Sequence, residues 1–517
     1  MEIDRRIGRG LLARNSVFNF LGQILAMLAG ILTIPYVVKG LGTNGYGILS
    51  IAYMVLGYFT IFDLGLSRAT VRFVADHLNP EKAHKIPELV WTSFSVLIGL
   101  GCVGGLVGVA LVPFAVTYIF KMPVSFVGEA RASLLILCAS MPVMLGNDAL
   151  RGVLEATQRF DLVNYVKVPG SVCFYLLAAF AVSFGVKVPG VVLLLVLVRL
   201  TTAAAYLVLC FRVVPGLRSG FRISRKVIRP LASFGGWIMV SNITGPIHGY
   251  LERFLIASVL SVTMLTFYSV PFELVGKILI FPASIAPALF PYFSYHGSRH
   301  GTEVADVTSR SIKFLLLVLT PVTGIFVFFA RDILRLWMGP EFATQSTMVL
   351  QLLAIALFLN AFAYIPYSSV QALGRPDLKA ILDLFTLPLN ALLCWLLMRW
   401  MGIGGAALGK VLITVVDTGF LFGFAWRMKA FSLRDCISGP LLNGLLASTG
   451  LVFILFSIEC LHATLLVSLS LVTASLVLYG AAFWVFAIDR NERAVIKSIS
   501  APLLLTRQPV QSNGVQE

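Results

Sequence analysis

The chain alternates long uncharged apolar runs with short polar connections. A continuous apolar run of about 18 residues or more is long enough to cross the hydrocarbon core of a bilayer as an α-helix. We count about fourteen such runs, which predict an all-α polytopic membrane protein. The predicted spans are 16–38, 46–66, 89–112, 131–150, 162–183, 190–211, 230–250, 262–290, 313–330, 347–370, 380–399, 404–426, 437–457 and 464–487.

One polar connection occurs twice along the chain. The first copy is GVLEATQRFDL at residues 152–162, and the second is SSVQALGRPDL at residues 368–378. Ala, Arg, Asp and Leu occupy equivalent positions in both, and each copy lies between two predicted spans. Internal duplication of this kind is typical of membrane transporters.

The repeat also predicts how the spans are grouped. The first copy joins the fourth and fifth spans and the second joins the tenth and eleventh, so the repeated unit has six helices. An even number of crossings returns the chain to its starting side, which makes the two units parallel repeats. We predict an N-terminal lobe over residues 1–229, a C-terminal lobe over 230–430, an accessory helix pair over 431–490 and a tail over 491–517.

Composition and charge agree with this organisation. The chain is 58% hydrophobic and 12% charged, with a net charge of +16 and a mean hydropathy of +0.90. Most of its 40 Lys and Arg residues fall in the connections on one side, and the positive-inside rule places that side and both termini in the cytoplasm. The basic connections are expected to contact anionic headgroups of the phospholipid bilayer. No soluble domain is predicted that would bind nucleic acid.

Three segments carry a resemblance to a known family: LGTNGYGILS at 41–50, LGLSRATVR at 64–72 and EATQRFD at 155–161. They resemble the Wzx-like O-antigen and exopolysaccharide flippases of the multidrug/oligosaccharidyl-lipid/polysaccharide (MOP) superfamily, and the resemblance covers the whole chain. It implies two lobes that alternate access to the two sides of the bacterial inner membrane. It also implies transfer of undecaprenyl-diphosphate-linked oligosaccharide from the cytoplasmic to the periplasmic leaflet, without catalysis. A polysaccharide polymerase and a chain-length regulator are the protein partners expected in such a pathway.

A lipid diphosphate needs cations inside the membrane, and Arg199 is the first candidate. It lies near the middle of the sixth span in the run VVLLLVLVRL. A charge at that depth costs about 2.5–3.5 kcal/mol, so it must face water, a partner or a ligand. Arginine binds phosphate bidentately. We expect Arg199 either to contact the headgroup or to pair with an acidic residue such as Asp417 or Glu273.

Lys277 and Lys410 are the candidate cations of the second lobe. Lys277 follows Glu273 by four residues on one helical face, so the two form either a permanent ion pair or one that opens when the diphosphate takes Lys277. Lys410 and Asp417 share a face but lie about two turns apart, too far for a direct pair. Glu273 and Asp417 are candidates for coupling to a proton or cation.

Two further charged positions lie near predicted span ends. Asp383 is either a third coupling acid or the partner of Lys379, four residues earlier. Arg68 and Arg72 place two cations on one face at the cytoplasmic end of the second span. They form either an entry site for an anionic headgroup or an ordinary basic anchor.

Uncharged polar residues mark the first, seventh and eighth spans. Asn15, Asn19 and Gln23 form a stripe along one face of the first span, and Asn242 lies in the seventh. Such amides bind sugar hydroxyls or join helices. The eighth span carries four prolines, and we expect it to be a bent helix that lines a cavity.

Other functions remain open at this stage. A multidrug or cation antiporter of the same superfamily would need an acidic cavity, and another lipid-diphosphate flippase would need the same cations. A polysaccharide polymerase or ligase would need a large extracytoplasmic loop, which the sequence lacks. We expect no cofactor and no metal site, since the six histidines show no metal-ligand spacing. Transport is compatible with coupling to H⁺, to Na⁺ or to the membrane potential.

Overall fold

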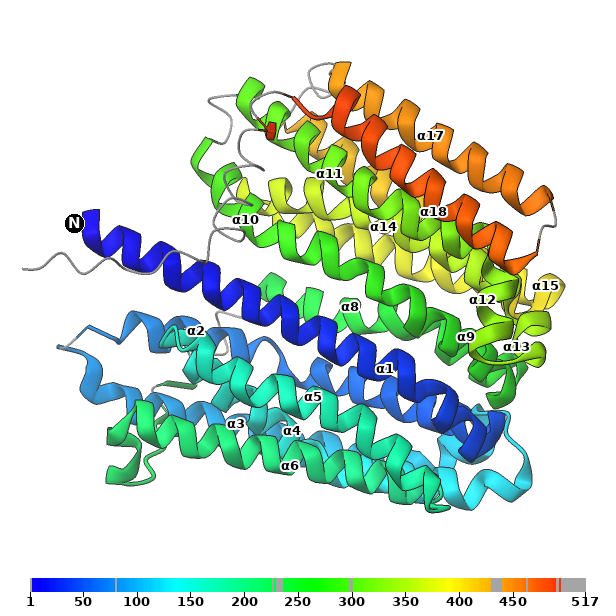
Figure 1. The fold of residues 1–517 in the computed structure, drawn as a ribbon. Coiled ribbons are helices and arrows are strands. Elements are labelled where there is room, and N and C mark those ends of the chain that lie inside the picture. The colour runs from blue at the N-terminus through cyan, green and yellow to red at the C-terminus, as the bar shows by residue number, and fades with distance from the viewer. Residues whose placement is uncertain are drawn as a thin grey trace, which may run out of the picture.

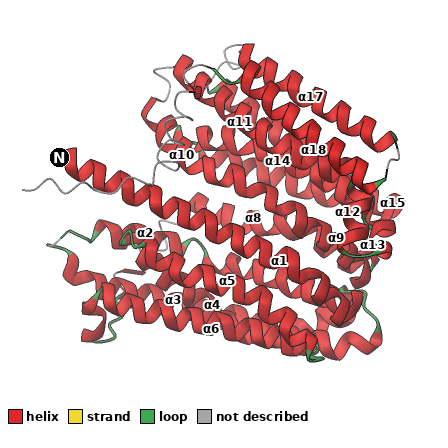
Figure 2. Cartoon of the chain, in the orientation of Figure 1, coloured by secondary structure: helices red, strands yellow, loops and turns green. Residues whose placement is uncertain are grey.

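The computed structural model describes the backbone of residues 2–79, 81–225, 227–228, 236–296, 301–428, 439–461, 464–489 and 492–493. The side chains of residues 2–20 and of a few other helical positions lie outside the description. Helices joined by short connections make up this part of the chain, and no strand occurs in it (Figure 2). The all-α prediction is confirmed.

The first half of the chain forms a bundle that occupies the lower part of Figure 1. Neighbouring helices in it pack pairwise, with α1 against α5, α3 against α4, and α6 against both α4 and α5. Its helices are α1 (Glu2–Tyr58), α2 (Leu66–Asp76), α3 (Ile86–Phe114), α4 (Val124–Ala156), α5 (Phe160–Ser183) and α6 (Val188–Val213).

The second half forms the upper bundle of Figure 1, with α17 and α18 on its outer side against α11. The three domain boundaries expected near residues 230, 431 and 491 all lie outside the described residues. The helices are α8 (Gly236–Leu255), α9 (Val262–Val275), α10 (Ile280–His296), α11 (Gly301–Phe328), α12 (Ala330–Trp337), α13 (Pro340–Gln345), α14 (Thr347–Ala372), α15 (Pro376–Arg427), α17 (Gly439–Cys460) and α18 (Leu465–Ala482).

Two of these helices each contain two predicted spans. In the described residues, 11 helical segments are long and apolar enough to cross a membrane. α1 changes direction at Gly42 (φ 72°) and α15 at Gly402 (φ 57°), so each of them turns back across the membrane. With these two divisions and with α8, the segments account for the predicted number of about fourteen spans.

The repeated loop has the same local structure in both copies. Gln158 and Gly374 occupy equivalent left-handed positions, with φ of 57° and 77°. The following amides close the same turn, from Arg159 N to Leu154 O at 2.9 Å and from Arg375 N to Val370 O at 3.1 Å. Each arginine then holds the aspartate two residues later with two side-chain hydrogen bonds, Arg159 to Asp161 and Arg375 to Asp377. The loop therefore fixes the same rigid helical hairpin in each lobe.

The two lobes are joined at the end of the molecule that carries Gly42, which lies at the right of Figure 1. We call this the Gly42 end and the opposite one the Arg159 end. The hydrogen bonds between the lobes include Thr263 Oγ1 to Asn44 Oδ1 (2.5 Å), Thr266 Oγ1 to Thr43 O (2.6 Å), Lys121 Nζ to Val259 O (2.7 Å) and Trp337 Nε1 to Ile31 O (2.9 Å). The distribution of basic residues predicts that the Gly42 end is extracytoplasmic.

Gly47 sits at the tightest contact of this junction. A Cβ atom added to it would lie 2.2 Å from the carbonyl oxygen of Val262, on the N-terminal turn of α9. Real side chains do not approach a backbone oxygen so closely. Only glycine therefore permits this approach of α1 to α9 without a shift of one of them.

The predicted bend in the eighth span is confirmed. α9 gives way to a 3₁₀ turn, Gly276–Leu279, before α10 begins. Pro282 has no backbone N–H, so it cannot bond to the Ile278 carbonyl four residues earlier, and a tighter turn replaces the α-helix there. Lys277 lies in this turn and, as predicted, the bent segment lines a cavity.

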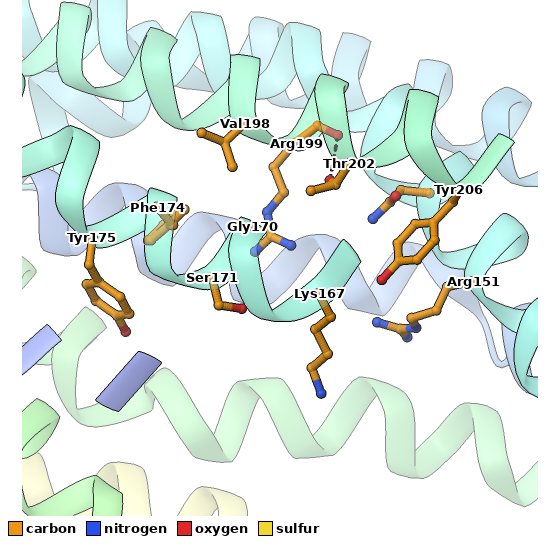
Figure 3. Close-up of a pocket in the computed structure, with 11 residues that line it drawn as sticks. Arg151, Lys167, Gly170, Ser171, Phe174, Tyr175, Val198, Arg199, Thr202 and Tyr206 are labelled. Carbon is orange, nitrogen blue, oxygen red and sulfur yellow. Dashed lines mark hydrogen bonds between the residues drawn. The ribbon is translucent and has the colours of Figure 1, made fainter. Parts of the chain in front are cut away.

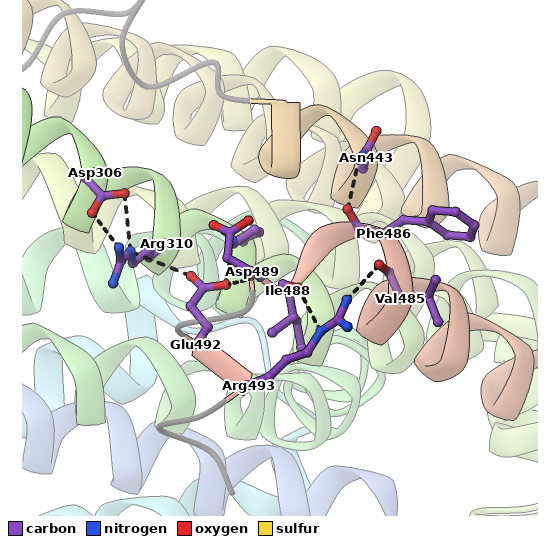
Figure 4. A network of polar contacts seen from close by, with 10 residues as sticks. Asp306, Arg310, Asn443, Val485, Phe486, Ile488, Asp489, Glu492 and Arg493 are labelled. Carbon is purple, nitrogen blue, oxygen red and sulfur yellow. Dashed lines mark hydrogen bonds and ion pairs between the residues drawn. The ribbon is translucent and has the colours of Figure 1, made fainter.

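A network of ion pairs fixes the accessory helices to the C-terminal lobe (Figure 4). Lys313 of α11, only 6% exposed, lies 2.8 Å from Glu492 and 3.7 Å from Asp489, both just beyond the last helix. Arg310 binds Glu492 from the preceding turn of α11 at 3.7 Å. The segment after α18 is thereby held against α11 at the Arg159 end.

Candidate functional site

A cationic cavity of about 280 Å³ lies within the N-terminal lobe, among α4, α5 and α6 (Figure 3). Arg151 of α4, Lys167 of α5 and Arg199 of α6 face it, and no carboxylate lines it. Arg199 extends from α6 toward α5, while Lys167 points from α5 into the open space. We call this the N-lobe cavity.

The three cations differ in their partners. Arg151 lies 3.3 Å from Asp148 and 3.3 Å from Glu155, so its charge is balanced within α4. In the described part of the chain, no carboxylate oxygen lies within 4.0 Å of Arg199 or Lys167. The cavity therefore presents two cations that have no carboxylate within ion-pair distance in the described residues.

The expected acidic partners of Arg199 lie elsewhere. Glu273 is held by other cations and Asp417 lies in the C-terminal lobe. What contacts Arg199 is the ring of Phe174, whose centroid is 5.8 Å from the guanidinium carbon. An ion pair of Arg199 with Glu273 or Asp417 is therefore wrong for this conformation, which leaves its guanidinium available to an anion.

A smaller pocket of about 120 Å³ lies between the lobes, deeper toward the Gly42 end. We call it the interlobe pocket. Phe174 and Tyr175 of α5 line both this pocket and the N-lobe cavity, so the two spaces adjoin. Its wall is formed by α1 and α5 from one lobe and by α8 and α9 from the other. Its aromatic residues are Tyr46, Tyr53, Phe174, Tyr175 and Tyr250.

The polar side of the interlobe pocket is formed by Arg253 and Glu273, and Lys277, which does not line the pocket, completes a charged triad with them. Glu273 lies 3.2 Å from Arg253 and 3.7 Å from Lys277, so the predicted Glu273–Lys277 pair is confirmed but shares its acid with a second cation. The Arg253 side chain is 5% exposed, and its guanidinium carbon lies 4.3 Å from the centroid of the Phe272 ring. The triad carries one positive charge in excess.

Lys277 extends the cationic surface into a third space between the lobes. This central cavity, about 330 Å³, is lined by Gln23, Lys277, Tyr175 and Tyr364 among others. The Lys277 ammonium lies 5.7 Å from the centroid of the Tyr175 ring, so it contacts the N-terminal lobe from the bent eighth span. Gln23, predicted as a sugar contact, does face a cavity between the lobes.

The C-terminal lobe encloses a cavity of about 510 Å³ in which charges are largely paired. We call it the C-lobe cavity. Lys410 lies 3.1 Å from Glu252, which is 1% exposed and also accepts a hydrogen bond from Asn390 at 3.1 Å. Lys379 pairs with Asp383, as the four-residue spacing predicts. Asp417 lines the same cavity, and Lys410 does not pair with it, again as predicted.

Arg68, Arg72 and Asn242 line none of these cavities. Arg68 is exposed on α2, and Arg72 on the same helix lies 4.0 Å from Asp76 with more than half of its side chain exposed. Asn242 is half-buried on α8. The side chain of Asn19 lies outside the described residues.

Three charged residues that line or support the cavities were not singled out from the sequence. Lys167 lies in the predicted span 162–183 but was not among the candidate cations, and α5 carries it into the lobe. Glu252 and Arg253 were placed beyond the seventh span, whereas α8 continues to Leu255. The apolar residues that follow Arg253 could have indicated the longer helix, because they extend the hydrophobic segment past both charges.

Comparison with known proteins agrees with this arrangement. The family described as "Polysaccharide biosynthesis protein" matches residues 12–296, and the MatE family matches residues 238–396. A Shigella flexneri protein named "Putative O-antigen transporter" is 29% identical over 417 residues, which cover 80% of this chain and 98% of the relative.

Solved structures share the fold at low sequence identity. "Lipid II flippase MurJ, inward closed conformation" superposes with a TM-score of 0.69 at 14% identity, covering 91% of this chain and 99% of that one. An inward-facing multidrug resistance MATE family transporter of the MOP superfamily gives a TM-score of 0.65 at 15% identity, covering 79% and 95%. The family match spans more than half of the sequence. The chain therefore belongs to the polysaccharide biosynthesis protein family.

Proposed function

We propose that this protein is a flippase that moves undecaprenyl-diphosphate-linked oligosaccharide from the cytoplasmic to the periplasmic leaflet of the bacterial inner membrane. It would serve the assembly of a cell-surface polysaccharide, as the name of its Shigella relative suggests for that protein. Arg199 and Lys167 would bind the diphosphate, and Lys277 would receive it from the side of the C-terminal lobe.

The N-lobe cavity is the observation that carries this proposal. Arg199 lies 14 residues before the end of α6, which places it about 20 Å from the Arg159 end of that helix. At this depth a guanidinium without a carboxylate partner is unfavourable unless water or an anion faces it. A diphosphate satisfies both Arg199 and Lys167 with charge-assisted hydrogen bonds, and the cavity has no lining carboxylate to repel it.

The arrangement of the lobes favours entry from the cytoplasm. The hydrogen bonds between Thr263 and Asn44 and between Lys121 and Val259 hold the lobes together at the Gly42 end. The N-lobe cavity extends from Arg151, near the opposite end of α4, toward the middle of the membrane. If the basic connections and both termini lie in the cytoplasm, this conformation would accept cargo from the cytoplasmic leaflet.

The charge distribution argues against the drug antiporter. A cation binding site should present an uncompensated acid, yet Glu252, Glu273 and Asp383 are each paired with a basic side chain. Asp417 is the acid that remains for such a role, and it lies in the C-lobe cavity. Another lipid-diphosphate flippase shares the cation requirement and differs only in the sugar.

Transport needs no chemical step in this proposal. A doubly anionic headgroup that leaves a negative cytoplasm gains free energy from the membrane potential, at about 2.3 kcal/mol per charge and 100 mV. Exchange for H⁺ or Na⁺ is compatible with the acids of the C-lobe cavity. A polymerase and its chain-length regulator would take over the cargo in the periplasm.

Replacement of Arg199 tests the proposal. In the host strain, Arg199→Ala should abolish surface polysaccharide and leave lipid-linked oligosaccharide on the cytoplasmic leaflet, while the amount of membrane-inserted protein is unchanged. Arg212→Ala is the matched control, because Arg212 is an exposed residue on the last turn of the same helix and lines no described cavity. Wild-type export by Arg199→Ala would show that Arg199 does not bind the headgroup.

A further inference from the structure

The proposed function assigns no ligand to the interlobe pocket. We propose that it is the sugar-binding subsite, which takes the sugar attached directly to the diphosphate of the cargo. This inference rests on the proposed function. It assigns a binding site to the sugar, which is the part of the cargo that the cations do not recognise.

The aromatic wall is the first argument. The rings of Tyr53 and Phe174 lie with centroids 5.6 Å apart, and those of Phe174 and Tyr175 also 5.6 Å apart at 84°. Tyr250 closes the opposite side, where it packs edge-to-face on Tyr58. Aromatic faces with a few polar groups bind a pyranose, whose C–H bonds pack on a ring while its hydroxyls bond at the edges.

Hydroxyl groups without partners are the second argument. Among the described residues, no hydrogen bond is made by the hydroxyls of Tyr46, Tyr53 or Tyr175. A phenol in a membrane interior normally finds a partner, because each of these groups both donates and accepts. Sugar hydroxyls have the same dual character and would satisfy them. Arg253 and Glu273 add a donor and an acceptor on the facing lobe.

The distance from the cations is the third argument. Phe174 contacts the Arg199 guanidinium on one side and the Tyr53 ring on the other. The first sugar of the cargo is bonded directly to a phosphate oxygen, so a phosphate held by Arg199 places that sugar one aromatic residue away. The pocket volume of about 120 Å³ is smaller than that of the other three cavities described above, which favours one sugar ring over a chain.

The charged residues of the pocket disfavour an organic cation as its ligand. An aromatic cage beside a free carboxylate is the usual site for a quaternary ammonium group. Here Glu273 is held by both Arg253 and Lys277, so the pocket presents no free carboxylate. A sugar finds polar partners there, whereas a cation finds no acid to pair with.

Both lobes build this subsite, which gives the sugar a part in the transport step. Tyr53 and Tyr175 belong to the N-terminal lobe, and Tyr250, Arg253 and Glu273 to the C-terminal lobe. A bound sugar would contact both, so it would be released when the lobes separate at the Gly42 end. The same pocket would therefore both select the first sugar and respond to the change of conformation.

The test compares two lipids on the full-length protein in nanodiscs. The probes are undecaprenyl diphosphate and undecaprenyl diphosphate carrying one hexose or N-acetylhexosamine. Wild-type protein should bind a sugar-bearing lipid about tenfold more tightly than the bare lipid. Tyr53→Leu should remove this preference and leave the affinity for the bare lipid unchanged. Tyr53→Phe, which loses only the hydroxyl, should lose part of it.

Matched controls separate this inference from the proposed function. Tyr165→Leu, on α5 but 78% exposed, should keep the sugar preference. Equal wild-type affinity for the two lipids, both weakened by Arg199→Ala, would overturn the sugar subsite alone. Failure of the bare lipid to bind would instead contradict the diphosphate site. Binding of tetraphenylphosphonium that Tyr53→Leu abolishes would assign the pocket to organic cations and overturn the inference.

Discussion

The two lobes contain equivalent hairpins but different cavities. Arg159 and Arg375 hold the same turn with the same bidentate contact to an aspartate. The N-lobe cavity nevertheless presents Arg199 and Lys167 without carboxylate partners in the described chain, whereas Lys410 of the C-lobe cavity binds the buried Glu252. The duplicated elements are therefore those that fix helix geometry, and the charges that would meet the cargo differ between the copies.

This difference separates a cation available to a ligand from a structural one inside a membrane. Both kinds are single charges in long apolar runs, and hydropathy treats them alike. A structural cation such as Lys410 has an acid on a neighbouring helix within 3.1 Å. The cation proposed to bind the cargo, Arg199, has an aromatic neighbour, a cavity and no acid within ion-pair range in the described residues.

The largest expected effect is on stability, in the C-terminal lobe. Lys410→Met leaves the buried Glu252 carboxylate without its cation and should destabilise the protein by about 3–5 kcal/mol. The melting temperature of purified protein in detergent measures this loss, and the double variant with Glu252→Gln should recover most of it. Arg199→Ala should leave the melting temperature unchanged. If Lys410→Met kept its melting temperature but no longer bound undecaprenyl diphosphate, the contrast between the lobes would fail.

A smaller effect is expected on binding, in the N-terminal lobe. Lys167→Ala removes one charge-assisted contact, worth about 1.5–3 kcal/mol, so the affinity for undecaprenyl diphosphate should fall at least about tenfold. Lys379→Ala is the matched change in the other lobe, where the lysine is paired with Asp383, and it should change this affinity less than about twofold. Titration of both variants with the lipid in nanodiscs makes the comparison. Equal losses in the two would place the diphosphate between the lobes.

The smallest effect is expected in the repeated loop. Gln158 and Gly374 share the left-handed position, which glycine adopts without strain and other residues adopt at a cost of about 1 kcal/mol. Exchanging the residues should therefore act in opposite directions: Gln158→Gly should raise the melting temperature slightly, and Gly374→Gln should lower it. Transport should be unaffected by either. A loss of export at unchanged stability would give the loop a role beyond holding the hairpin.

The sequence predicted the features that depend on local spacing. The Glu273–Lys277 and Lys379–Asp383 pairs follow from the four-residue period of a helix. The bend near Lys277 follows from proline chemistry, since Pro282 removes a backbone donor. The number of spans and the parallel repeat follow from hydrophobic length and from the duplicated loop.

The ion pairs that depend on packing between helices could not be predicted from the sequence. Glu252 and Lys410 lie on α8 and α15, and nothing in the intervening sequence predicts that they meet. The limit of the seventh span was wrong because two adjacent charges looked like its end, whereas Lys410 and Glu273 compensate them inside the lobe. The partner expected for Arg199 was wrong for the same reason, since those acids are held elsewhere. Which acid neutralises which base on another helix depends on the tertiary structure, so local sequence spacing does not predict it.

The close approach at Gly47 has a consequence for the equilibrium between the two orientations of the lobes. The junction closes only because this position lacks a Cβ atom, so any larger side chain there would act as a wedge between α1 and α9. A wedge raises the free energy of the closed junction and leaves the separated one unaffected, which shifts the population toward the state open at the Gly42 end. The size of the side chain at residue 47 would therefore bias the resting orientation of the transporter before any cargo binds.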